Sequence, residues 1–172
     1  GIVGIRTRVA FRSDYLVFSP ILATNKRFAE NTGTLYRFSK GHGGIACEGC
    51  HNSTHAIWPN PDDLHNDNVA SRQVQGHTGT LVECSACHGA GTVALGLNGP
   101  HGMHVVNDRR WTDDGHGDVA ERNRSACAAC HGSNYRGTVL SRTAAQRSWS
   151  SRTVPKGTPV GCYDCHNGPG GD

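Results

Sequence analysis

The stretch Cys47-Glu48-Gly49-Cys50-His51 recurs three more times with only its middle pair of residues changed. The other copies are Cys84-Ser85-Ala86-Cys87-His88, Cys127-Ala128-Ala129-Cys130-His131 and Cys162-Tyr163-Asp164-Cys165-His166. Together the copies use all eight cysteines of the 172-residue chain, and successive first cysteines are 37, 43 and 35 residues apart. This spacing organises most of the chain as a loose four-fold array.

The composition excludes several common protein classes. Only 35% of the residues are hydrophobic and 23 are glycine, whereas globular domains have roughly 45–50% apolar residues when glycine is counted. No apolar run approaches the ~18 residues that a membrane span needs. The net charge of +3 is too small to indicate a nucleic-acid partner. Something other than aliphatic side chains must therefore hold the chain together.

The Cys-x-x-Cys-His pattern is typical of covalent c-type haem attachment. Two thiols three residues apart lie on one side of a helical turn and can bond the two vinyl groups of one haem, while the next histidine supplies an axial nitrogen to the iron. A disulfide framework would not place a histidine after every second cysteine, a zinc site would leave four histidines unexplained, and a thioredoxin-like motif would occur once. The sequence predicts four covalently bound haem c groups, with proximal iron ligands His51, His88, His131 and His166.

Thioether attachment of haem takes place outside the cytoplasmic membrane, so we expect an exported protein. The chain begins Gly1-Ile2-Val3-Gly4, without a charged segment followed by an apolar one. We interpret it as a mature form from which a signal peptide has been removed.

The predicted fold is mostly irregular, with a few short helices, short N-terminal strands and no large regular core, and is organised by haem. Helix-forming residues predict a helix at 118–131, and β-branched and aromatic residues predict strands at 2–11 and 15–18. Residues 1–40 contain no cysteine or histidine. We therefore divide the chain into an N-terminal segment, 1–40, and a tetrahaem domain, 41–172.

Histidines outside the motifs can complete the coordination of every iron. There are seven of them: His42, His55, His65, His77, His101, His104 and His116. Four irons need at most four distal ligands, and Met103, the only methionine, could serve one iron at best. We predict two histidine ligands on each iron, which argues against catalysis at an open coordination position.

Sequence distance narrows the choice of distal ligand. His55 lies four residues after His51, on nearly the same side, so we expect it to ligate a neighbouring haem. Only four residues separate His42 from Cys47, which is too short a tether to pass around that haem. His42 must serve a different haem or none.

The remaining histidines are less constrained. His101 and His104 are expected to supply one ligand between them, with His104 favoured. His116 can reach the third haem or an adjacent one, because it lies eleven residues before Cys127. His65 and His77 lie in polar stretches, where solvent exposure is the favoured interpretation.

Longer stretches resemble the extracellular cytochrome filaments known as OmcS-type and OmcE-type nanowires. The stretches are Gly41–His51, Ser53–Pro59, Gly99–His104, His116–Asp118 and Tyr135–Ser141, within residues 41–170. The resemblance implies a helical homopolymer with a continuous haem chain and two histidines on every iron. It also implies that His42 ligates the Cys162–His166 haem of a neighbouring subunit.

We therefore expect long-range extracellular electron transfer by a filament protomer whose 1–40 segment contacts another subunit. The expected partners are further copies of the chain, upstream periplasmic or outer-surface cytochromes, and extracellular acceptors such as metal oxides or partner cells, without nucleic acid. The first alternative is a monomeric periplasmic tetrahaem electron shuttle. The second is a multihaem reductase of nitrogen or sulfur oxyanions.

Overall fold

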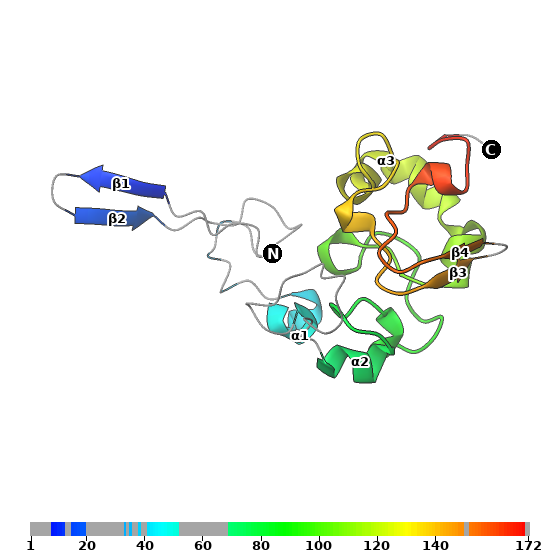
Figure 1. The fold of residues 1–172 in the computed structure, drawn as a ribbon, viewed down its shortest axis with the longest axis horizontal. Coiled ribbons are helices and arrows are strands. Elements are labelled where there is room, and N and C mark those ends of the chain that lie inside the picture. Colours follow the sequence, from blue (N-terminus) through cyan, green and yellow to red (C-terminus); the bar gives the residue numbers. More distant parts are fainter. Residues whose placement is uncertain are drawn as a thin grey trace.

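The computed structural model describes the strands at 8–12 and 15–19, positions 33, 35 and 38, and residues 41–51, 69–149 and 152–170. In these residues regular structure is sparse and consists of two short hairpins, a few short helices and single helical turns joined by loops (Figure 1). The predicted irregular class without a large regular core is confirmed for this part of the chain. Its organisation by haem stays a prediction.

An antiparallel hairpin lies near the N-terminus. It pairs β1 (Arg8–Arg12) with β2 (Tyr15–Ser19), with Phe11 opposite Leu16. The hairpin, blue in Figure 1, lies apart from the helices. The predicted strand at 15–18 is confirmed, and so is the 8–11 part of the predicted strand at 2–11. The rest of that prediction falls outside the described residues.

Three α-helices are present in the described residues: α1 (Cys47–His51), α2 (Val69–Gln75) and α3 (Gly117–His131). The longest, α3, confirms the helix predicted at 118–131. Asp118 in its first turn suits the positive end of the helix dipole. The helix ends at Gly132, whose φ of +85° is a conformation that glycine adopts without strain. The third Cys-x-x-Cys-His motif therefore lies on the last turn of a real helix.

A second hairpin lies near the C-terminus. It joins β3 (Arg147–Trp149) and β4 (Arg152–Val154), with Arg147 opposite Val154. Both of these opposed residues are buried. The sequence did not predict this hairpin.

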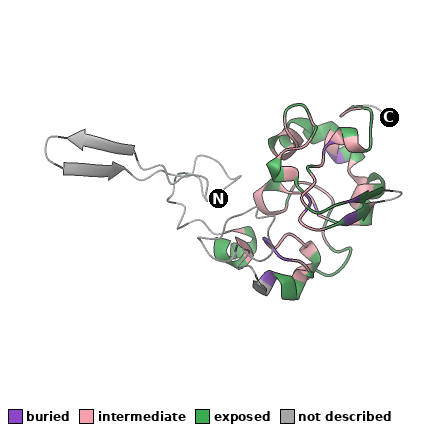
Figure 2. Cartoon of the chain, in the orientation of Figure 1, coloured by how far each residue is buried: buried purple, intermediate pink, exposed green. Residues whose placement is uncertain are grey.

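The apolar core of the described residues is very small (Figure 2). Its buried hydrophobic side chains are Val105, Val119 and Val154. The buried polar or charged residues are Ser71, Thr78, Thr80, Thr143 and Arg147. Each fully buried valine contributes about 1.5–3 kcal/mol. The three valines together fall far short of the cost of ordering the backbone, which is ~1–2 kcal/mol for every residue ordered. The chain therefore needs a further source of apolar contact.

The described part of the chain contains no helix with both the length and the apolar character needed to span a membrane.

Candidate functional site

Every Cys-x-x-Cys-His motif begins in a helical turn. The first lies in α1, the third ends α3, and the second and fourth start with single 3-10 turns at Cys84–Ala86 and Cys162–Asp164. In the last two, the histidine amide donates to the carbonyl of the first cysteine at the same distance, 2.9 Å. This is the local geometry that places both thiols of a motif on one side.

No disulfide joins any two of the eight cysteines. In the described residues no group of three or more histidine, cysteine, aspartate or glutamate side chains is arranged to hold a metal ion. A zinc site of the usual four-ligand kind needs such a group, whereas a haem iron takes only axial ligands from the protein.

Each motif histidine faces one histidine from outside the motifs. We name the pairs by motif: site one is His51 with His101, site two His88 with His42, site three His131 with His104, and site four His166 with His116. Their ring centroids are 6.0, 5.9, 6.2 and 5.6 Å apart, in that order.

These separations fit an iron between the two rings. An imidazole nitrogen bonds a metal ion at about 2.0–2.1 Å, so two opposed Nε2 atoms lie about 4 Å apart and the ring centres roughly 6 Å apart. The observed centroid distances of 5.6 to 6.2 Å are close to this value and slightly shorter than a metal-bound pair requires. In site four the two Nε2 atoms face each other at 3.4 Å, so that site must open slightly to admit a metal.

Backbone carbonyls orient three of the site histidines. The Nδ1–H of His131 donates to Val160 O at 2.6 Å, that of His116 to Trp111 O at 2.7 Å, and that of His104 to Val105 O at 3.0 Å. A histidine that donates through Nδ1 presents an unprotonated Nε2, which is the form that binds a metal. These contacts fix both the tautomer and the ring orientation.

Burial favours the neutral imidazole of His51 and of His104. The pKa of His51 is lowered by burial and further by the nearby His101. The pKa of His104 is also lowered, chiefly by burial, because the opposing effect of its carbonyl bond is smaller. Only an unprotonated nitrogen can ligate iron, so both shifts favour coordination.

Other features of the described residues fit the remaining parts of a haem. Thr80 Oγ1 and Trp149 Nε1 are buried without a hydrogen-bond partner, and haem propionates would accept from both. Ile45, beside the first motif, is 44% exposed, and Tyr163, inside the fourth, is 40% exposed. Exposed apolar side chains beside attachment points suit a large apolar ring. The residues therefore fit the group.

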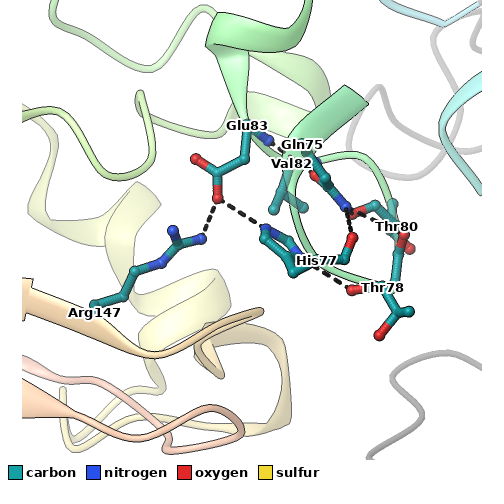
Figure 3. Close-up of polar contacts among 8 residues, drawn as sticks. Gln75, His77, Thr78, Thr80, Val82, Glu83 and Arg147 are labelled. Atoms are coloured by element: carbon teal, nitrogen blue, oxygen red, sulfur yellow. Dashed lines mark hydrogen bonds and ion pairs between the residues drawn. The ribbon is translucent and has the colours of Figure 1, made fainter. Parts of the chain in front are cut away.

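His77 differs from the site histidines because its two ring nitrogens contact a backbone carbonyl and a carboxylate (Figure 3). Nδ1 lies 3.0 Å from Thr78 O and Nε2 lies 3.0 Å from Glu83 Oε1. These contacts hold the ring between a backbone carbonyl and a carboxylate. Its side chain is 13% exposed, so the prediction of solvent exposure is wrong for His77.

The same carboxylate holds Arg147 of β3, so Glu83 joins the segment before the second motif to the C-terminal hairpin (Figure 3). Gln75, at the end of α2, accepts from the Val82 amide at 2.9 Å and donates to Thr80 O at 3.1 Å. These contacts fix the residues that lead into Cys84.

The histidine arrangement differs from two of the sequence-based predictions. Within this chain His42 lies opposite His88, and His166 lies opposite His116; ligation of a neighbouring subunit's last haem by His42 stays a prediction. The tether argument agrees with the structure, since His42 does not face the first motif. His101 and His104 also do not share one role, because each faces a different motif histidine.

His55, predicted to ligate a neighbouring haem, and His65, predicted to be exposed to solvent, lie outside the described residues. His116, expected at the third haem or an adjacent one, faces the fourth motif.

Sequence reasoning missed His101 as a separate partner of His51 and missed the Glu83–Arg147 contact. Nothing in the sequence signals a pairing across 64 residues, although the position of Glu83 directly before Cys84 was visible. Searches against family models, curated proteins and solved structures find no match to this chain.

Proposed function

We propose that this protein is an exported tetrahaem c-type cytochrome that transfers electrons. The observation that carries the proposal is the set of four histidine pairs, each joining a Cys-x-x-Cys-His histidine to one other histidine at a spacing that fits iron. Haem bound there would supply a one-electron couple between ferric and ferrous iron. The chain supplies eight thiols and eight imidazoles, enough for four complete sites.

Two axial histidines leave no iron position for a substrate. This supports electron transfer over reduction of nitrogen or sulfur oxyanions, which needs an open coordination position. The carbonyl bonds to His104, His116 and His131 hold those rings in one orientation, so the ligands stay in place when the charge of a site changes.

Assembly into an extracellular filament is a proposal supported by the resemblance of residues 41–170 to filament cytochromes. In that assembly the partners are further copies of the chain, upstream cytochromes, and extracellular acceptors such as metal oxides or partner cells. One observation favours the monomeric shuttle instead, since a single chain holds both histidines of all four sites. A filament of this protein therefore needs no iron ligand from a neighbour. Negative-stain imaging of the native protein distinguishes the two.

The central test is the haem content and spin state of the purified native protein. We expect four covalently attached haems per chain by mass, and a fully low-spin spectrum that cyanide and carbon monoxide leave unchanged. A count below four, or a haem that binds these ligands readily, would contradict the proposal. The variant His77→Gln is the matched control, because the His77 ring faces a carboxylate and a carbonyl. This variant should keep four low-spin haems.

A further inference from the structure

We propose that the four sites lie in the spatial order two, one, three, four, which differs from their order in the sequence. The inference rests on the proposed function and deepens it, because the order decides which sites can exchange electrons with partners. It follows from the segments that each pair of neighbouring sites shares.

Sites one and two share two segments. The Leu81 amide, shortly before the second motif, donates to Cys50 O of the first motif at 2.9 Å. His42 ligates site two but begins the turn that leads into Cys47. The attachment sides of these two sites therefore lie together.

Sites one and three are joined by one tight turn. His101 faces site one and His104 faces site three, and three residues of chain span at most about 11 Å between their Cα atoms. The Gly99 amide donates to Met103 O and the Met103 amide to Pro100 O, both at 3.0 Å. A Cβ on Gly99 would lie 2.7 Å from Met103 O, so this closure requires glycine.

Sites three and four are joined through the Trp111 ring and through the helix α3. The Trp111 ring lies parallel to His104 at 4.5 Å and 6.0 Å from His116. His116 directly precedes α3, which ends in the motif of site three. These contacts place site four beyond site three.

Exposure agrees independently with this order. Both histidines of site two, His42 and His88, are exposed, and so is His166 of site four. The four histidines of sites one and three are all partly buried. End sites are therefore the accessible ones, and a one-electron donor and a one-electron acceptor would each dock against site two or site four.

A competing order would join site two directly to site three. Cys84 of the second motif and the segment 105–109, which follows His104, line one cavity of about 220 Å³. Contact through this cavity would give the order one, two, three, four. The experiment must separate this sequential order from the proposed one.

The test is nuclear magnetic resonance of the fully reduced native protein, in which low-spin ferrous haems are diamagnetic. We expect nuclear Overhauser contacts between haem substituents of sites two and one, one and three, and three and four. Contacts between sites two and three, with none between one and three, would overturn the order. Four assigned haems in that case would leave the proposed function standing, whereas a missing haem would count against the function itself.

A second measurement uses His101→Met, which should raise the reduction potential of site one, because histidine–methionine ligation raises it relative to bis-histidine ligation. That site then takes the first electron. We expect the paramagnetic shifts of the haem resonances at sites two and three to change, and those at site four to remain as in the wild type. His42→Met is the matched variant at an end site and should change site one alone. If His101→Met changes site two alone and His42→Met changes sites one and three, the proposed order is wrong.

Discussion

At the scale of single residues, the partners of the ring nitrogens separate the histidines. Of the eleven histidines, His55 and His65 lie outside the described residues, and among the others only His77 has both nitrogens bound by a carbonyl and a carboxylate. The rest face one another in four pairs. Hydrogen-bond partners thus assign roles that the polar neighbourhood of His77 could not reveal.

His101 and His104 should each complete a different iron. We predict that His101→Ala and His104→Ala each convert one haem of four to high spin, and that the double variant converts two. Each substitution removes one axial nitrogen while the thioethers keep the haem attached. Electron paramagnetic resonance of the ferric proteins measures the high-spin fraction. An unchanged spectrum for His101→Ala would show that the two histidines supply only one ligand.

His42 should ligate an iron of its own chain. We predict that His42→Ala makes one haem of four high-spin at every protein concentration, because His88 lies in the same chain at a centroid distance of 5.9 Å. A dilution series followed by absorption spectroscopy tests this. A wild-type haem that loses its ligand on dilution, as assemblies separate, would instead show that a neighbouring chain supplies the histidine.

At the scale of elements, the sequence predicted the structures that depend on residues close together in the chain. The helix at 118–131 is built from good helix formers, and α3 covers it as Gly117–His131. The helical turns of the motifs also follow from their own residues. The β3–β4 hairpin was missed because its three-residue strands depend on the contact between Arg147 and the distant Glu83. The histidine pairs join residues up to 50 positions apart, a distance over which no periodic pattern carries information.

The Glu83–Arg147 ion pair should anchor the C-terminal hairpin. The two side chains are 9% and 6% exposed, and removal of one partner of a buried pair costs about 3–5 kcal/mol. We predict a loss of that size for Arg147→Met, measured by denaturant unfolding of the haem-loaded protein. The double variant Glu83→Gln/Arg147→Met should lose less, because no lone charge stays buried. A loss below about 1 kcal/mol in the single variant would contradict this role.

The turn that presents His116 should loosen in acid. The Asp108 carboxylate accepts from the Arg110 backbone amide at 2.9 Å and from its guanidinium at 3.1 Å. The guanidinium bond, the larger cause, lowers the pKa of Asp108 below its ordinary value of 3.8. Because the folded pKa lies below the unfolded one, the stabilisation is present above about pH 4 and is lost as the pH falls further.

The expected result is a melting temperature that falls more steeply with acid in the wild type than in Asp108→Asn, which has no carboxylate to protonate at this position. Calorimetry of both proteins between about pH 5 and about pH 2 gives the comparison. Equal acid slopes would exclude a contribution from this carboxylate.

At the scale of the whole molecule, we expect the N-terminal hairpin and the proposed haem-binding part, 41–172, to have separate roles. We predict that deletion of residues 1–20 leaves all four haems attached but prevents filament formation, because the deleted residues include β1 and β2 and none of the motifs. Mass spectrometry reports the haem count and negative-stain imaging reports assembly. Normal filaments from the truncated protein would assign the subunit contact to another surface.

The turn at Gly102 has a consequence for biogenesis. All histidines of sites one and two lie between positions 42 and 101, and all histidines of sites three and four lie between 104 and 166. No ligand pair crosses Gly102. If the four sites hold haem as we propose, a chain exported N-terminus first has released every histidine of sites one and two before the first histidine of sites three and four emerges. Haem attachment can then proceed in two consecutive rounds, one on each side of Gly102.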